Sequence, residues 1–305
     1  VTYPQAVSGA AACRVGGSSV WRMPAVKELY SLILFSGVNG RPDEGGRGYV
    51  PFLDRKFFDF AYGDPAEGVR LIDCQDWSAD ENKASGGNLV FGVNFADGRI
   101  KSYPKIKRRE RRENHLFVRY VRGNPAYGTN RFAANRDGTV ADSATGLMWS
   151  RSDSQTGMDY PEAEKYVETL NRRNYLGHHD WRIPTAKELQ SIVDYRRSPD
   201  VTQSPAIDPV FQTSTITNEA GKKDYPCFWT STRLNIDGHP AEQVYIAFGR
   251  ALGFMNQRWV DIHGAGAQRS DPPTGDPSRF KNGRGPQGDA VRIKNYLRVV
   301  RTVSQ

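Results

Sequence analysis

The chain contains few cysteines and no long hydrophobic run. Its 305 residues include only Cys13, Cys74 and Cys227, and no two of them have the short spacing of a zinc knuckle or a redox motif. The most apolar stretch, residues 29–35, is far shorter than the roughly 18–20 residues that cross a bilayer. We therefore expect neither a metal site of this kind nor a transmembrane helix.

Motifs for catalysis are also absent. The histidines, at positions 115, 178, 179, 239 and 263, belong to no HExxH zinc motif. No phosphate-binding loop and no serine nucleophile elbow occurs. We expect a protein without enzymatic activity and without a cofactor.

The cysteines leave the redox state open. Three thiols cannot pair fully within one chain. A disulfide between Cys13 and Cys74 is the favoured pairing, because both lie in the first half of the sequence. Three buried thiols are the alternative.

The composition is that of a globular protein, with 38% hydrophobic and 25% charged residues. The net charge is +8, and much of it comes from residues 105–112, which contain six basic side chains and one glutamate. Multidentate arginine contacts suit sulfate or phosphate, so this segment is a candidate site for a polyanion. An interface with an acidic subunit and a solvated loop are the other interpretations. The basic residues are Lys105, Lys107, Arg108, Arg109, Arg111 and Arg112.

An internal repeat organises the chain. The sequence WRMPAVKEL at 21–29 recurs as WRIPTAKEL at 181–189. Four further blocks recur in the same order, and they predict tandem domains at residues 1–123 and 130–305, joined by a linker at 124–129. These blocks pair residues 3–6 with 160–163, 51–57 with 205–211, 77–78 with 229–230 and 117–122 with 296–301.

The second copy begins with a segment that the first copy lacks. Residues 131–149 have β-rich ends around an Asp/Ser/Gly turn and predict a β-hairpin. The equivalent segment of the first copy would precede Val1. We expect either a truncated or processed chain or a strand supplied by another chain, as in strand complementation.

Apolar spacing predicts further elements. Residues 160–172 have the spacing of an amphipathic helix, and Thr185 with Glu188 forms a capping box for the next one. Residues 90–95, 243–248 and both Arg-containing end segments alternate like strands. The pattern predicts an α+β fold with a loop-rich middle.

The residues that recur with Trp and Arg are interpreted as structural. Tryptophan buries a large area, so we expect the recurrent tryptophans to pack internally rather than form a sugar platform. We expect Arg22 and Arg182 to pair with internal carboxylates. The recurrent tryptophans are Trp21, Trp77, Trp181 and Trp229.

These motifs together resemble the bacterial DUF1566 family, also called the C-terminal domain of Legionella collagen-like adhesins. The resemblance is carried by WRIPTAKEL at 181–189, DGTVADSATGLMW at 137–149 and the Val-Arg end segment. It implies two tandem C-type-lectin-like domains, each with two helices, a small antiparallel sheet and long irregular loops. It also implies a secreted, periplasmic or cell-surface binding protein, and one member of the family binds sulfated glycosaminoglycans. Many relatives carry two cysteines, of which Cys13 matches the first, while Tyr120 and Val299 occupy the second position.

A second segment differs between the copies. Residues 256–290 contain six glycines and four prolines and are interpreted as an inserted loop that needs packing partners to be ordered. The side chains that we interpret as candidates for ligand or partner binding are Trp259, His263, Arg279, Lys281 and Arg284. A structural calcium ion at Asp271 and Asp276 is a weaker alternative to turn capping by these residues.

The sequence therefore favours an exported binding or adhesion module that recognises a glycan or another polyanion through its basic loops. The alternative is a structural subunit of a surface appendage or filament, assembled through the same loops with an acidic partner or a further copy. An enzyme related to formylglycine-generating enzymes ranks third. Because the charge is concentrated in one segment, nucleic-acid binding is not expected.

Overall fold

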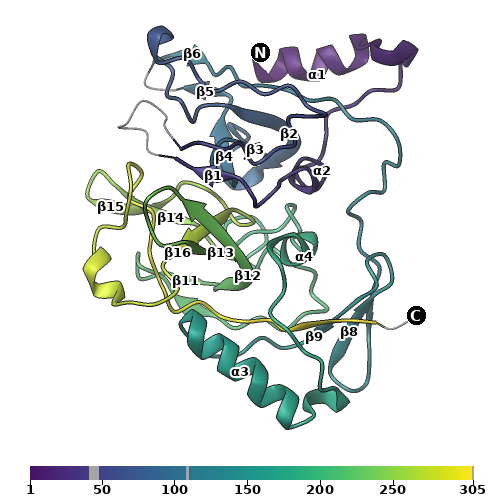
Figure 1. The fold of residues 1–305 in the computed structure, drawn as a ribbon, viewed down its shortest axis with the longest axis vertical. Coiled ribbons are helices and arrows are strands. Elements are labelled where there is room, and N and C mark those ends of the chain that lie inside the picture. Colours follow the sequence, from purple (N-terminus) through teal and green to yellow (C-terminus); the bar gives the residue numbers. More distant parts are fainter. Residues whose placement is uncertain (41–47, 108–109, 304–305) are drawn as a thin grey trace. The chain divides into compact units, whose positions relative to one another are not determined.

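The computed structural model describes residues 1–40, 48–107 and 110–303. Its elements form a mixed α+β structure, which confirms the fold class predicted from the sequence (Figure 1). The chain divides into two compact units, one of residues 1–128 and 234–241 and one of residues 129–233 and 242–305. Among the described residues, no helix is long and apolar enough to cross a membrane.

The first unit contains two α-helices and an antiparallel sheet in which β3 lies between β2 and β4. A short hairpin of β5 and β6 follows the sheet. β1 pairs in parallel with the end of β12, which explains why residues 234–241 belong to this unit. The elements are α1 (Tyr3–Ala12), α2 (Val26–Ser31), β1 (Val38–Asn39), β2 (Gln75–Asn82), β3 (Leu89–Asn94), β4 (Arg99–Pro104), β5 (Ile106–Lys107) and β6 (Arg112–Glu113).

The first helix begins at a capping box. The Thr2 side chain accepts a hydrogen bond from the Gln5 backbone N–H, and the Gln5 side chain accepts one from Thr2. One face of the helix then packs on Trp77, which is fully buried with Ala6 and Val90. The helix is therefore fixed to the sheet through a tryptophan of β2.

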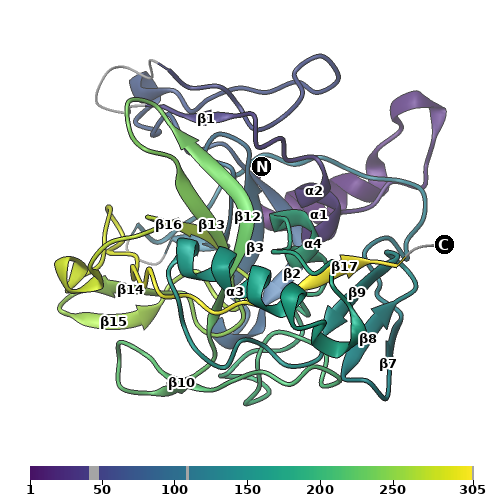
Figure 2. The ribbon, with the colours of Figure 1, turned by 60° about the horizontal axis from the view of Figure 1, so that its bottom comes forward.

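The second unit contains two α-helices and two sheets. One sheet has the strand order β12-β13-β16, and the other has the order β17-β9-β8-β7 (Figure 2). Two short hairpins, β10–β11 and β14–β15, complete the unit. The helices and first strands are β7 (Phe132–Ala134), β8 (Thr139–Asp142), β9 (Leu147–Ser150), α3 (Tyr160–Arg172), α4 (Ala186–Ser191), β10 (Ile216–Thr217) and β11 (Lys223–Asp224). The remaining strands are β12 (Cys227–Ile236), β13 (Glu242–Ala247), β14 (Leu252–Met255), β15 (Arg258–Asp261), β16 (Gln268–Asp271) and β17 (Val300–Thr302).

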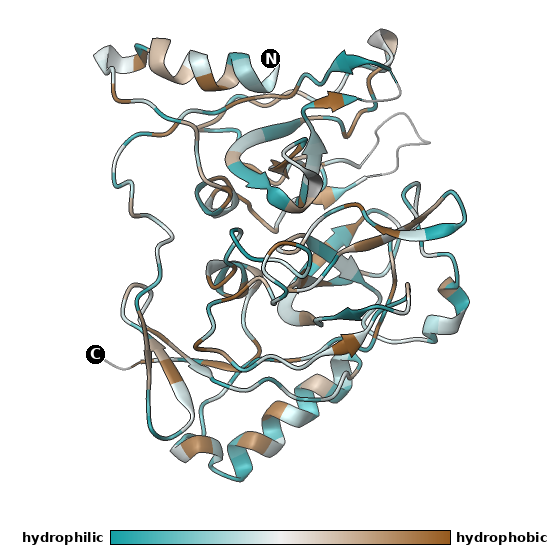
Figure 3. Cartoon of the chain, turned by 180° about the vertical axis from the view of Figure 1, so that it is seen from behind, coloured by the Kyte–Doolittle hydropathy of each residue, from teal (hydrophilic) through white to brown (hydrophobic). Residues whose placement is uncertain are grey.

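Helix α3 has the bounds predicted from the apolar spacing. Figure 3 shows apolar and polar residues alternating along this helix, the lowest one in the view. Its buried face consists of Tyr160, Ala163, Val167 and Leu170. The capping box predicted at Thr185 is confirmed, because the Thr185 side chain accepts from the Glu188 N–H while Glu188 accepts from Thr185.

The strands predicted at residues 90–95 and 243–248 are confirmed within one residue, whereas the end segment at 296–301 forms a strand only at its last residues. The strand expected at 90–95 is β3, and the strand expected at 243–248 is β13. The end of the second unit forms β17. Residues 117–122 form only isolated bridges, at Phe117 and Val121, so the expectation of a strand there is wrong. A strand needs a paired neighbour, and β17 has β9 beside it.

The interpretation of residues 256–290 as one inserted loop is also wrong. This stretch contains β15 and β16, and β16 pairs with β13 in the sheet. The residues of β16 are polar, which made them resemble a loop, but all four are buried. Asn256 and Gln257 have φ angles of 50° and 60°, the left-handed backbone of a two-residue hairpin turn between β14 and β15.

Candidate functional site

The recurrent arginines pair with carboxylates, as predicted. The Arg22 guanidinium forms two hydrogen bonds of 2.6 Å with Glu28. Arg182 contacts Glu188 in the same bidentate way, at 2.7 and 2.6 Å. Because each carboxylate also accepts a backbone N–H at the start of α2 or α4, the pair fixes the helix to the residue after the tryptophan.

The recurrent tryptophans of β2 and β12 are structural in the same way. The indole N–H of Trp77 donates to the Val1 carbonyl at 3.1 Å, and that of Trp229 donates to the Met158 carbonyl at 2.8 Å. Both side chains are fully buried, which confirms the internal role expected for them. Val1 in the first unit therefore occupies the position that Met158 has in the second unit.

The end segments occupy matching positions as well. Val121 exchanges backbone hydrogen bonds of 2.9 and 3.0 Å with Arg22. Val300 exchanges equivalent bonds of 2.9 and 3.1 Å with Arg182. Each end segment therefore pairs along one edge with the arginine that follows the recurrent tryptophan. The other edge of the end segment differs between the units.

In the first unit this edge borders a cavity of about 540 Å³. Its walls come from the end of α1, from the residues around α2 and from the end segment, and most of them are apolar. Val15 is 68% exposed, and Leu32 and Val121 are partly exposed. The lining residues are Cys13, Val15, Trp21, Pro24, Glu28, Leu29, Ser31, Leu32, Phe58, Arg119, Tyr120, Val121, Arg122, Asn124 and Tyr127. We call this cavity the α2 groove.

The basic segment forms the β5–β6 hairpin, and internal acids offset part of its charge. Lys105 pairs with Glu81, and its ammonium group also lies 4.7 Å from the centre of the Tyr3 ring. Arg112 pairs with Glu110. The candidates Arg108 and Arg109 lie outside the described residues.

Lys107 and Arg111, the other described cations of this hairpin, have different surroundings. Lys107 is partly exposed and is the cross-strand partner of Arg112. Arg111 is exposed at the turn, with a left-handed φ of 49°. Within the described part of the chain, neither side chain forms an ion pair with an acid.

The candidates of residues 256–290 separate into buried and exposed groups. His263 is buried, and its Nε2 lies 2.7 Å from the Asp289 carboxylate, which Arg269 also contacts. Arg284 lies 2.5 Å from Glu242. These contacts hold the long segment against β13 and β16 and account for its order.

The other candidates of this segment lie at the surface. The Trp259 ring packs edge to face on Phe254, with their centres 5.2 Å apart. Arg279 and Lys281 are exposed on and after a 3₁₀ turn at Pro277–Phe280. The structure therefore does not bring the candidates of residues 256–290 together into one site.

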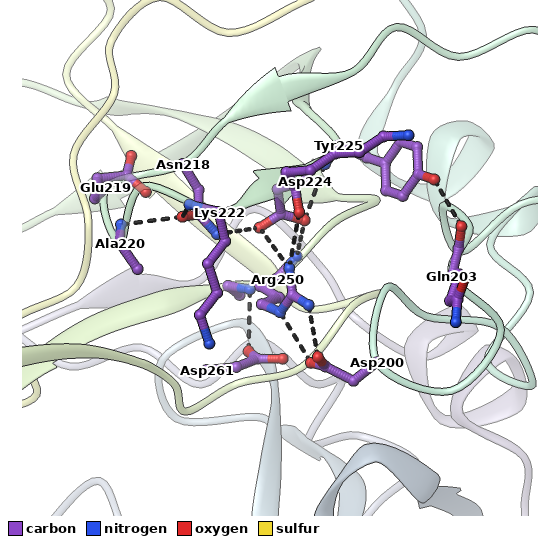
Figure 4. A network of polar contacts seen from close by, with 12 residues as sticks. Asp200, Gln203, Asn218, Glu219, Ala220, Lys222, Asp224, Tyr225, Arg250 and Asp261 are labelled. Atoms are coloured by element: carbon purple, nitrogen blue, oxygen red, sulfur yellow. Dashed lines mark hydrogen bonds and ion pairs between the residues drawn. The ribbon is translucent and has the colours of Figure 1, made fainter.

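Sequence reasoning missed a network around Arg250 (Figure 4). The guanidinium lies between Asp200, at 2.9 and 2.5 Å, and the fully buried Asp224, at 3.6 Å. Asp261 lies close by and accepts the backbone N–H groups of Ala251 and Gly264. Burial raises the pKa of Asp261 to about 7, and repulsion by the other two carboxylates adds to this effect.

The network has no arrangement that suits a metal ion. Among the described residues, no group of three or more acidic, histidine or cysteine side chains is arranged to bind one. The proposed calcium ligands have other contacts: Asp271 accepts the backbone N–H groups of Arg292 and Ile293, and Asp276 caps the 3₁₀ turn. The contacts of Asp276 match the turn-capping interpretation, whereas Asp271 binds a distant segment of backbone instead.

The favoured disulfide is not present. Cys13, Cys74 and Cys227 are free thiols. Cys13 lines the α2 groove, whereas Cys74 lines a separate cavity with Phe117, so the two thiols do not meet. Burial raises the pKa of both Cys74 and Cys227 to about 12.

Comparison with known proteins identifies one family. Residues 138–260 match the family model of the Lcl C-terminal domain. This match confirms the resemblance noted in the sequence for the central part of the second unit. No curated protein and no solved structure matches the chain.

Proposed function

Since residues 138–260 match the Lcl C-terminal domain, we propose that this protein is a non-enzymatic, exported binding module of the adhesin type. Its ligand is a polyanion such as a sulfated glycan, bound by the β5–β6 hairpin of the first unit. The described hairpin offers Lys107 and Arg111 for this contact, together with Arg108 and Arg109 in the sequence between them. The pairing of Lys105 with Glu81 removes Lys105 from the set, whereas Arg112, although paired with Glu110, lies opposite Lys107 and remains in it.

The cross-strand position of Lys107 and Arg112 is the observation that supports this proposal most. Like charges directly opposite in a hairpin are unfavourable unless an anion lies near them. Glu110 offsets only one of these two cations. A bound sulfate or carboxylate between the strands stabilises the hairpin and the complex at the same time.

The test is a heparin-binding measurement at increasing salt concentration, because contacts between exposed charges weaken as salt screens them. The double variant Lys107→Gln/Arg111→Gln should lose roughly tenfold or more in affinity, since each lost contact is worth about 1 kcal/mol. The matched control is Arg279→Gln/Lys281→Gln, which removes the same charge from an exposed turn of the second unit. It should bind heparin nearly as the unmodified protein does.

Equal losses in the two double variants would mean that net charge alone drives binding, which contradicts the proposal. A loss confined to the control would instead assign the contact to the turn at residues 277–281. Absence of salt-sensitive binding in the unmodified protein would remove polyanion recognition altogether.

A further inference from the structure

The α2 groove has a counterpart in the second unit, where a β-hairpin fills it. There, β9 pairs with β17, and Val300 is the register partner of Trp149. Trp149 and Val140 are fully buried and share a cluster with Leu189, Ile192 and Val300. The β8–β9 hairpin thus covers the edge of the end segment and the apolar side of α4.

The matching side chains of the first unit have no such cover from the described residues. Leu32 and Val121 stand at the repeat positions of Ile192 and Val300, which are at most 1% exposed. Leu32 and Val121 themselves are partly exposed and line the groove. The residue types are equally apolar, so the difference in exposure comes from the β8–β9 hairpin that lies beside Ile192 and Val300.

A phenylalanine ends the repeat block at residues 51–57 and 205–211, and its exposure differs between the units in the same way. Phe211 packs edge to face on Phe132 of β7, with ring centres 5.0 Å apart, and is 5% exposed. Phe57, at the matching position, is 72% exposed. An isolated exposed phenylalanine is ordinary on a protein surface. Phe57, however, matches a residue that the β17-β9-β8-β7 sheet covers in the second unit.

The backbone edge is open as well. Val121 directs its N–H and C=O to Arg22, so its neighbours Tyr120 and Arg122 direct theirs to the opposite side, as alternation along an extended chain requires. The backbone groups of Tyr120 and Arg122 form no hydrogen bond within the described residues. At the matching place in the second unit, Ser150 donates to the carbonyl of Val299 at 3.0 Å.

Arg119 adds a charged feature to this edge. Its counterpart Arg298 is 1% exposed and donates to the carbonyls of Ser150, the last residue of β9, and of Arg151, the next residue along the chain. Arg119 donates to the Asp59 carbonyl through one terminal nitrogen, and its buried Nε lies 3.7 Å from the Asp76 carboxylate, which leaves the other terminal nitrogen without a hydrogen bond among the described residues. Carbonyl oxygens of a docked strand match the donors that remain.

We propose that the α2 groove receives a β-hairpin from outside residues 1–305, built like residues 137–150. The occupant is a peptide segment whose inner strand carries large apolar side chains at alternate positions, as Leu147 and Trp149 do in β9. It adds a strand to the edge at Tyr120 and Arg122, buries Leu32 and Val121, and accepts hydrogen bonds from Arg119. The proposal is independent of the polyanion contact at the β5–β6 hairpin.

The test supplies a hairpin of this chemistry in two forms. In the first, a synthetic peptide of residues 137–151 is added to the full chain. In the second, residues 131–157 are fused ahead of Val1, which reproduces the spacing before Met158 and raises the effective concentration of a hairpin that is unstable alone. Hydrogen exchange at the Tyr120 and Arg122 amides should slow at least tenfold in one or both forms.

Two variants make the result specific. Leu32→Asp, which places a charge in the groove, should abolish the protection, whereas Leu34→Asp should retain it, because Leu34 is 39% exposed and does not line the groove. A peptide with Trp149→Ser should bind at least tenfold more weakly.

Several results would overturn the proposal. These are unchanged exchange at Tyr120 and Arg122 in both forms, equal protection in the Leu32 and Leu34 variants, or protection at Val299 and Arg301 instead. A dimer that forms without added hairpin and protects the Tyr120 amide would assign the groove to a second copy.

Discussion

Arg298 donates a hydrogen bond of 2.9 Å to the backbone carbonyl of Ser150, so the last segment of the second unit holds the first hairpin of that unit. The same guanidinium donates to the Gln212 carbonyl at 2.9 Å and lies over the Phe211 ring, 5.0 Å from its centre. Burial lowers the pKa of Arg298 to about 10, which leaves the side chain charged at neutral pH. A single buried cation therefore connects three stretches of backbone.

Replacement of this cation should be costly. Arg298→Met leaves buried carbonyl groups without donors, at about 1–3 kcal/mol for each unsatisfied group. We expect a loss of about 3 kcal/mol or more in the free energy of unfolding of the second unit, measured by urea denaturation. Arg279→Met is the control and should change stability by less than about 0.5 kcal/mol, since Arg279 is exposed on the 3₁₀ turn of the same unit. Equal losses would show that the carbonyl contacts of Arg298 contribute nothing.

The ion pair at the start of α2 predicts a second effect on stability. Glu28→Gln removes the charge that binds Arg22 and weakens the hydrogen bond to the Ala25 N–H. Because the Glu28 side chain is 9% exposed, we expect a loss of about 1–2 kcal/mol in the free energy of unfolding. Arg196→Gln removes one partner of a pair whose arginine is 83% exposed, and it should change stability by less than about 0.5 kcal/mol. A Glu28 variant as stable as the Arg196 variant would show that the pair contributes nothing.

Local signals allowed much of the framework to be predicted. Apolar spacing and a capping box act within one or two turns, so the bounds of α3 and the start of α4 follow from nearby residues. The pairing of Arg22 and Arg182 with internal carboxylates was predicted because each arginine directly follows a recurrent tryptophan.

Other features depend on contacts between distant residues. The residues of β16 are polar and form a strand only because β13 lies beside them. His263 and Arg284 meet their acids 26 and 42 positions away, respectively, which no local pattern encodes. The α2 groove escaped prediction as a cavity, although the repeat already showed that residues 1–123 contain no counterpart of the hairpin at residues 131–149.

The raised pKa of Asp261 predicts how stability depends on pH. The folded pKa of about 7 lies above the unfolded value of 3.8, so the folded state holds the proton more tightly. This contribution to stability is fully present below about pH 4 and is lost as the pH rises through 7. Asp261→Asn keeps an oxygen for the Ala251 and Gly264 N–H groups and does not titrate.

Urea denaturation between pH 4 and 8 measures this difference. The unmodified protein should lose stability relative to Asp261→Asn as the pH rises, with the change centred between pH 4 and 7. Asp271 has a folded pKa of about 6, so Asp271→Asn should show a smaller effect of the same sign. Parallel curves for the unmodified protein and the Asp261 variant would exclude the assigned pKa.

The free thiols predict a simple pattern of chemical reactivity. The thiolate is the reactive form, and burial holds the pKa of Cys74 and Cys227 at about 12, so neither thiol ionises at neutral pH. Cys13 is partly exposed at the end of α1. A thiol reagent at pH 8 should therefore modify one cysteine rapidly in the folded protein and all three after unfolding. Because a Cys13–Cys74 disulfide leaves only Cys227 reactive in the unfolded chain, mass spectrometry of the modified protein under non-reducing conditions distinguishes the two states. Cys13→Ser should remove the rapid reaction and leave the two slow ones unchanged.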